Sequence, residues 1–466
     1  MSKAIYVHRS VAEVLAKLVD GWRPRLPSLP TVHSMTWGML DIQNVVSVDL
    51  SQERIRLQCG PPFEPGNRSA NGEPLRGVLD GGLSLNVERA FWSSSRGTDS
   101  WIEGVYWTLT DPSRDPTLWI AELAGSVPEF GSNLIVRRSL NDESGGHFLL
   151  RGAYTYFVVR CAERWFLVVE TPDGRQPTRK ELFPDFLALQ FALGRVLSID
   201  RLLGVDAAGQ VIGVVGGRFG RHVGRNSQFE APVPMWVHDD AWAPTLFDRV
   251  SRTYRERPEL RLHIPLSAFV DVLADYLVEA RYLRLHVALE ALAYWLMKAK
   301  QQEDAEVVDK PGWRAWVRTH EMEIRRLAKP GFEDLLFNNV KGAHRHPSGK
   351  LVALAFHEFG LDLTKEMTDE LGNGRGGIVH RAVMFDESQP EVDAYLNRIA
   401  VVRTMLVALL SKIVGYRGPI QGWQRTPGHP FEPAPSSWWS PDTQAETEAQ
   451  YVAVVDESQS ARGVPE

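Results

Sequence analysis

Apolar positions in residues 1–240 occur in short runs, many of them alternating, that Gly, Pro, Asn and Asp separate. Runs of this length and pattern are typical of β-strands, and many short strands are typical of sandwich-like domains. The run at 154–161, three intervening residues and the run at 165–170 together predict a hairpin. Further strands are expected at 45–50, 55–58, 102–109, 118–121, 134–136 and 211–215.

Residues 178–200 change to a helical pattern. Thr178 and Glu181 have the spacing of a capping box, and apolar residues follow at helical spacing as far as Leu197. A helix is therefore expected here. It is followed by the strands near 211–215 and by the Gly- and Arg-rich segment 216–226.

The helical period is clearest after Pro265, where one apolar stripe continues to about Lys300. Shorter helices are expected at 313–327, 351–359 and 364–371. The last helix is well marked, because Ser388, Pro390 and Glu391 form an S-x-x-E start with Pro in the first turn. We expect it to run to about Val414, with Gly415 as its stop.

These patterns predict an α+β protein of several domains. The division that they favour is a β-rich domain at 1–175, a mixed connecting region at 176–257, an all-helical domain at 258–417 and a tail at 418–466. The tail is rich in Pro, Ser, Thr and Glu, which is typical of a flexible segment. A length of 466 residues agrees with two or three domains plus connections.

Charge and cysteine usage narrow the function classes. The formal net charge is -6, so any RNA contact must come from a local basic patch. The two cysteines, Cys59 and Cys161, share no short spacing with each other or with His, which argues against a disulfide framework and a Cys-based zinc site. Neither a signal-peptide pattern nor an apolar run of about 18 residues is seen, so no membrane association and a cytoplasmic location are expected.

One segment carries candidate chemistry. Residues 372–380 read Gly-Asn-Gly-Arg-Gly-Gly-Ile-Val-His and precede the capped last helix, with four residues between Arg375 and His380. Upstream, residues 287–292 read Val-Ala-Leu-Glu-Ala-Leu. Over about residues 265–415 the sequence resembles the HEPN superfamily, in particular its Apea-like branch. That family's signature is Arg, four to six residues, then His, shortly before the last helix of an α-bundle.

The resemblance implies a metal-independent endoribonuclease that acts as a homodimer through the helical domain, without a cofactor. Arg375 and His380 would be catalytic, with Glu290, Asn373 and Gly376 in support. Gly376 stands where many members of the family carry Asn. The two catalytic residue types suit the reaction, because His can exchange protons near neutral pH and Arg presents a positive fork to phosphate oxygens. Attack by the 2′-OH would leave a 2′,3′-cyclic phosphate.

Other residues allow more than one interpretation. His344, Arg345, His346 and Arg381 are expected to form a basic surface for RNA, although His344, His346 and His357 also invite the weaker interpretation of a metal site. Arg218 and Arg221 are candidates for a phosphate patch or for a plain basic turn. The tryptophans are more typical of a β-domain core than of a base-stacking platform; they are Trp92, Trp101, Trp107 and Trp119.

The leading hypothesis is an endoribonuclease of antiphage defence, or a toxin. Its substrate would be single-stranded RNA such as a tRNA loop, and its N-terminal region would sense a trigger, for example a phage-derived one, or regulate the nuclease. One alternative is a non-catalytic protein that binds RNA or nucleotide or only dimerises, which Gly376 favours. Another is a ligand-binding β-domain carried beside a structural helical domain.

Overall fold

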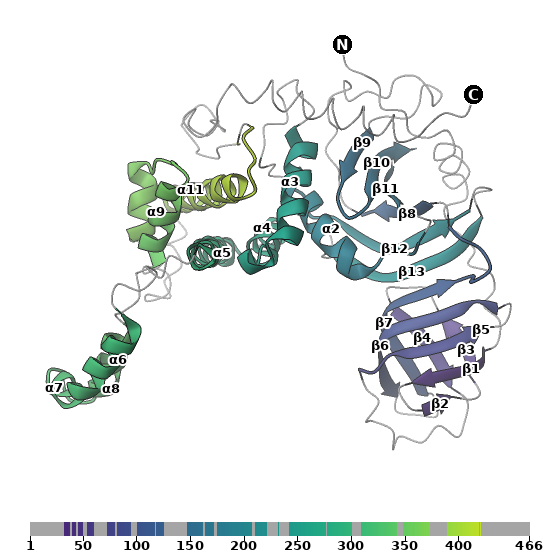
Figure 1. Ribbon diagram of the computed structural model, residues 1–466, viewed down its shortest axis with the longest axis horizontal. Coiled ribbons are helices and arrows are strands. Elements are labelled where there is room, and N and C mark those ends of the chain that lie inside the picture. Colours follow the sequence, from purple (N-terminus) through teal and green to yellow (C-terminus); the bar gives the residue numbers. More distant parts are fainter. Residues whose placement is uncertain are drawn as a thin grey trace, which may run out of the picture. The chain divides into compact units, whose positions relative to one another are not determined.

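The computed structural model describes residues 32–37, 40–42, 45–49, 54–59, 72–79, 82–94, 100–116, 118–124, 147–161, 164–171, 175–206, 210–220, 232, 242–275, 277–300, 309–342, 348–372, 389–418 and 420. These residues fall into two compact units, one up to Ser251 and the other from Arg252 onward. Pro232 is the exception, because it belongs to the second unit. The first unit is rich in antiparallel strands and the second is helical, so the chain is an α+β protein (Figure 1).

Every described strand pairing in the first unit is antiparallel. The predicted hairpin is confirmed as β10 and β11, and strands also lie at the positions expected from 45–50, 55–58, 102–109, 118–121 and 211–215. The expected strand at 134–136 lies outside the described residues. The strands are β1 (Val32–Trp37), β2 (Leu40–Ile42), β3 (Val45–Asp49), β4 (Arg54–Cys59), β5 (Leu75–Leu79), β6 (Ser84–Ser94), β7 (Ser100–Thr110), β8 (Leu118–Leu123), β9 (His147–Arg151), β10 (Thr155–Cys161), β11 (Arg164–Glu170), β12 (Ser198–Val205) and β13 (Val211–Gly220).

The sheet differs from the expected sandwich-like arrangement. The strands follow one hydrogen-bonded path, β4-β3-β1-β5-β6-β7-β13-β12-β8-β11-β10-β9, and β2 pairs with β1. Since β4 also pairs with β7, the first six strands of the path close into a ring. The other six continue from β7 as an antiparallel sheet. A closed ring leaves no free edge among its members, which a sandwich of two open sheets would have.

Strand β7 joins the ring to the open sheet. Along one edge of β7, the first half of the strand, Ser100–Val105, pairs with β4. Further along the same edge, Trp107–Thr110 pair with β13. The change of partner falls at Tyr106, which has a φ of 60°, opposite Gly217, which has a φ of 116°. These positive φ values bend both strands where one partner ends and the next begins.

Two tryptophans fill the core of the first unit against glycines. Trp107 and Trp119 are 1% and 0% exposed, as predicted for core residues. A Cβ on Gly216 would lie 2.1 Å from the Trp107 ring, and a Cβ on Gly204 or Gly213 would lie 3.0 Å from the Trp119 ring. Each indole therefore occupies the space that glycine leaves on another strand of the sheet.

Helix α2 (Arg179–Leu193) confirms the predicted helix start but ends earlier than expected. Thr178 is its N-cap, and its side chain accepts a hydrogen bond from the Glu181 amide at 3.3 Å. Gly194, with a φ of 59°, ends the helix in the left-handed conformation. The expectation of helix to about residue 200 was wrong, because Leu197 already leads into β12.

The second unit is helical, as predicted for the C-terminal half of the chain. Helix α3 is shared between the two units. The stripe from 265 to 300 is two helices, because Asp275 and Leu277 are extended. The helix expected at 313–327 is likewise divided at His320. The elements are α3 (Trp242–Glu256), the 3-10 helix η4 (Pro258–Leu260), α4 (His263–Ala274), α5 (Val278–Ala299), α6 (Lys310–Thr319), α7 (Glu321–Arg326), α8 (Glu333–Gly342), α9 (Ser348–Glu358), a helical segment at 365–372 and α11 (Gln389–Ile413).

Helix α5 is the centre of the second unit, because α4, α9 and α11 all pack against it. Its buried stripe includes Leu285, Leu289, Leu292 and Leu296, all 0% exposed. Helix α11 has the predicted length, and Gly415 follows it with a φ of 71°. In the described parts of the chain, no helix is both long enough and apolar enough to cross a bilayer.

Candidate functional site

Most residues of the predicted site lie outside the described parts of the chain. Glu290 is described on α5, where it is partly buried, and Arg218 is described only as backbone at the end of β13. The roles predicted for the site residues outside the described parts of the chain therefore stay predictions. The residues outside the description are Asn373, Arg375, Gly376, His380, Arg381, His344, Arg345, His346 and Arg221.

The structure does describe a polar cluster around Glu370, which comes shortly before the Arg375–His380 segment in the sequence. Glu370 lies in the helical segment 365–372, two residues before Gly372, and is 8% exposed. Its carboxylate accepts a hydrogen bond from Arg398 Nε at 3.0 Å and another from the hydroxyl of Tyr282. His286 Nε2 lies 3.2 Å from the same carboxylate. We call these four residues the Glu370 cluster.

The partners of Glu370 come from α5 and from α11, the helix that follows the motif in the sequence. Tyr282 and His286 are one turn apart on α5, with ring centroids 4.5 Å apart. Arg398 comes from α11, and its guanidinium lies over the Tyr282 ring at 5.1 Å. Residues four apart share one face of a helix, so Glu290 lies one turn further along the same face of α5.

Electrostatics in this cluster favour a charged Glu370. Burial alone would raise the pKa of this carboxyl, but hydrogen bonds from His286, Arg398 and Tyr282 outweigh burial and lower it. Burial and the bond to Glu370 raise the pKa of Tyr282, so the phenol stays a donor. The cluster is therefore a buried carboxylate held by neutral and cationic donors.

The cluster also places the helical segment 365–372 beside α11. Arg398 is nine residues into α11, which is about 13 Å along the axis at 1.5 Å per residue. The helical segment 365–372 thus lies beside the first half of α11, and that helix begins at Gln389.

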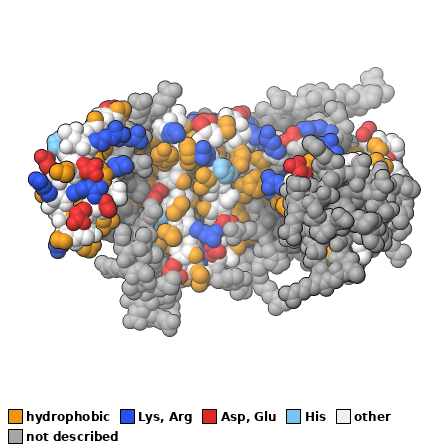
Figure 2. All heavy atoms as spheres, turned by 90° about the horizontal axis from the view of Figure 1, so that it is seen from below, with side chains coloured by type: hydrophobic (Ala, Val, Ile, Leu, Met, Phe, Trp, Pro, Cys, Tyr) orange, Lys and Arg blue, Asp and Glu red, His pale blue; other side chains and the backbone are white. Residues whose placement is uncertain are grey.

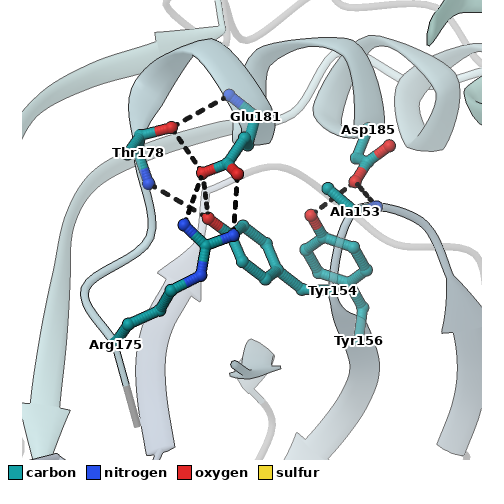
Figure 3. A network of polar contacts seen from close by, with 7 residues as sticks. All are labelled: Ala153, Tyr154, Tyr156, Arg175, Thr178, Glu181 and Asp185. Carbon is teal, nitrogen blue, oxygen red and sulfur yellow. Dashed lines mark hydrogen bonds and ion pairs between the residues drawn. The ribbon is translucent and has the colours of Figure 1, made fainter. Parts of the chain in front are cut away.

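A second polar network lies in the first unit, around the start of α2 (Figure 3). Arg175 donates to Glu181 at 2.7 Å, and the Tyr154 hydroxyl donates to the same carboxylate. The Thr178 amide donates to the Tyr154 oxygen at 3.2 Å, in place of the direct bond to Glu181 that a simple capping box would have. Burial and the bond to Glu181 raise the pKa of Tyr154 to about 12.

Asp185, one turn further along α2, is buried at 2% exposure. It accepts from the Ala153 amide and the Tyr156 hydroxyl, each at 2.6 Å (Figure 3). It also accepts from the Ser251 hydroxyl of α3. The adjacent cavity is lined almost entirely by apolar side chains such as Leu150, Leu167 and Phe247. The hydrogen bonds of the Asp185 side chain link α2 to β10 and α3. A buried carboxyl group with this many hydrogen-bond partners is typical of a structural anchor rather than a catalytic base.

Sequence patterns missed the Glu370 cluster. One signal was present, since Tyr282 and His286 are polar groups four apart on the predicted apolar stripe. Such groups are rarely buried without partners. Their partners could not be named, because Glu370 and Arg398 are distant in sequence.

No known protein family, curated protein or solved structure matches this chain. Within the described ranges, no three His, Cys, Asp or Glu side chains converge in a way that could hold a metal ion.

Proposed function

We propose that this protein is a metal-independent endoribonuclease of the HEPN type, in which Arg375 and His380 carry the chemistry. The observation that supports the proposal most is the Glu370 cluster. It holds the helical segment 365–372, which ends just before the motif in the sequence, against α5 and α11. In the family that the sequence resembles, the Arg-x4-His motif comes shortly before the last helix of the bundle. A catalytic loop needs such rigid flanks, because catalytic groups lose rate when misplaced by about 1 Å.

In this proposal each residue has a defined role. His380 exchanges protons with the 2′-OH or with the leaving oxygen, and Arg375 stabilises negative charge on the phosphorane. Glu290, on the same face of α5 as the Glu370 cluster, orients Arg375. Asn373 and Gly376 shape the turn, and Arg381 with His344, Arg345 and His346 contacts RNA.

The biological setting of the proposal rests on the family resemblance alone. The protein would act in antiphage defence or as a toxin, and the β-rich unit would respond to a trigger. Two copies would bring two Arg375–His380 pairs to one groove, which doubles the positive charge that faces phosphate.

The direct test is substitution of the two motif residues in the full-length protein. His380→Ala and Arg375→Ala should each lower the rate of RNA cleavage by about 10²–10⁴-fold, the usual contribution of an acid–base or charge-stabilising group. The exposed His357→Ala on α9 is the matched control and should cleave as the wild type does. Circular dichroism checks that all variants are folded. Wild-type cleavage by a folded His380→Ala protein would overturn the proposal.

The product and the metal requirement provide a second measurement. Cleavage should persist in EDTA and should leave a 2′,3′-cyclic phosphate, which mass spectrometry detects. A 2′-deoxy substitution at the cleaved position should abolish the reaction, because it removes the attacking hydroxyl. A strict need for Mg²⁺ would assign cleavage to other chemistry.

Gly376 favours a second candidate, a protein that binds RNA or nucleotide without cutting it. In that case Gly376→Asn, which restores the residue common in the family, should create cleavage that the wild type lacks. If the wild type already cuts RNA through His380, this candidate is excluded.

A further inference from the structure

Helix α6 carries an aromatic stack on the surface of the second unit. The rings of Trp313 and Trp316 are stacked with centroids 5.1 Å apart and an interplanar angle of 20°. Trp316 and His320 continue the stack at 4.5 Å and 25°. Trp316, the middle ring, is 45% exposed, so the stack does not lie in a core.

Two hydrogen bonds hold the stack in place. Trp313 Nε1 donates to the carbonyl of Lys341 at 3.2 Å, which ties the first ring to α8. His320 Nδ1 lies 2.9 Å from the carbonyl of Trp316. A stack that is ordered before binding loses little conformational entropy when a further ring packs on it.

Basic side chains border the same exposed face. Val317 is buried and marks the inner side of α6. From the helical period, the aromatic stack forms one border of the outer face and Arg314 with Arg318 forms the other. Both arginines are exposed, as are Ala315 and Thr319 between the borders. The result is an outer face with planar rings on one side and two guanidinium groups on the other.

Local placement, rather than overall charge, distinguishes this face. Figure 2 shows Lys and Arg mixed with Asp and Glu where α6, α7 and α8 lie. Within α6 itself, however, no residue is acidic. Among the helix pairs of the second unit, α6 packs chiefly with α7 and α8, so its outer face is not needed to bury the main helical core.

We propose that the outer face of α6 binds single-stranded nucleic acid, with an unpaired base stacked on an end ring of the Trp313–Trp316–His320 stack and the backbone phosphates held by Arg314 and Arg318. Stacking platforms beside positive charge are the usual means of binding single strands without sequence preference. The inference deepens the proposed function, because it names a surface that would hold the RNA substrate. It does not depend on cleavage.

Binding is best measured with the full-length protein and a fluorescein-labelled oligodeoxythymidylate of about 12 nucleotides, close to the site size of known single-strand binders. This probe has no 2′-OH and cannot be cut by the proposed chemistry. Trp316→Ala removes the middle ring and so breaks the stack on which the base packs. It should weaken binding by about 5- to 150-fold, the value of one base–aromatic stack. Met322→Ala on α7 is the matched control, since Met322 is 70% exposed and outside the stack, and it should bind as the wild type does.

The two arginines should also affect how strongly the binding affinity depends on salt concentration. Arg314→Gln with Arg318→Gln should reduce the slope of log Kd against log salt by about 1.4, because each neutralised phosphate contributes about 0.7 on a single strand. Arg326→Gln, an exposed arginine of α7, is the control. Thermal melting of every variant checks the fold, and Trp316→Phe keeps a ring if the alanine variant does not fold.

The outcomes separate this inference from the proposed function. Equal binding by the wild type and folded Trp316→Ala, or no binding by the wild type, overturns the inference while His380-dependent cleavage still stands. Stack-dependent binding without cleavage supports the inference and overturns the nuclease. If Met322→Ala weakens binding more than Trp316→Ala does, the exposed apolar residues of α7 and α8 are the contact surface and the assignment to α6 is wrong.

Discussion

At the scale of single residues, two buried carboxyl groups, those of Glu370 and Asp185, are held by donors from distant parts of the chain. Glu370 is bonded by α5 and α11, and Asp185 by β10 and α3. Sequence analysis indicated where helices lie but could not pair these residues, because hydrogen-bond partners far apart in sequence leave no local pattern. The family resemblance pointed to Glu290, whereas His286, one turn earlier on α5, is the group that contacts the Glu370 carboxylate.

Glu370→Gln should lower the free energy of unfolding by about 2–3 kcal/mol. Removing one charge of a fully buried pair costs about 3–5 kcal/mol, and the cost is smaller here because the Arg398 side chain is 36% exposed. Urea denaturation measures the change. Glu358→Gln is the control, because both side chains of the Lys300–Glu358 pair are 33% exposed, and it should cost at most about 1 kcal/mol. Equal losses in the two variants would contradict the prediction.

Glu181 gives a prediction about acid stability. Burial would raise the pKa of this carboxyl, but hydrogen bonds from Arg175, Thr178 and Tyr154 lower it from 4.5 to about 2. Because the folded pKa is depressed, the stabilisation is complete above about pH 4.5 and is lost as the pH falls toward about 2. Arg175→Gln should remove part of this dependence.

The measurement is urea denaturation of wild type and Arg175→Gln between about pH 5 and pH 2.5. The difference in stability between them should be largest at the upper end and should shrink on acidification. Arg164→Gln is the control, since its contact with Glu122 is 3.9 Å long and exposed. A difference that grows as the pH falls would refute the assignment.

At the scale of elements, local signals predicted some starts and stops well. The structure confirms three features that depend on short-range sequence patterns: the cap at Thr178, the hairpin of β10 and β11, and the bounds of α11. The ring of six strands could not be predicted, because it depends on β4 pairing with β7 across the intervening β5 and β6. The break between α4 and α5 was missed because the apolar period continues through Asp275 and Leu277.

Gly216→Ala should be strongly destabilising, because its methyl group would lie 2.1 Å from the Trp107 ring. Overpacking of this kind costs about 1–3 kcal/mol or more. The measurement is a double-mutant cycle with Trp107→Phe, which makes room at the same place. The double variant should lose less stability than the sum of the two single variants. Additive losses would show that the ring and the glycine are not in contact.

At the scale of the whole molecule, α3 belongs to both units. Ser251 bonds Asp185, and the Phe247 ring lies 6.0 Å from that of Tyr156, so the first unit needs most of this helix. The second unit begins at Arg252. The sequence-based division into four regions did not foresee a shared helix, because a single amphipathic helix gives no sign of which core receives each turn.

Fragments test this division. Residues 1–257 should express as a β-rich protein with a cooperative thermal transition, whereas 1–241 should lose that transition, because it lacks the buried Leu246, Phe247 and Val250. Residues 258–466 should show a helical circular dichroism spectrum. Equal melting temperatures for 1–257 and 1–241 would contradict the role given to α3.

The position of β7 between two sets of strands has a consequence for synthesis on the ribosome. Its partners in the ring, β4 and β6, both precede it in the sequence and are therefore translated before it. Its remaining partner, β13, is translated much later, because Gly216 pairs with Trp107. Until residues 211–220 emerge, Trp107–Thr110 present unpaired backbone groups beside a large apolar ring. Such an edge attracts other nascent chains, so the interval between β7 and β13 is when this protein most needs a chaperone.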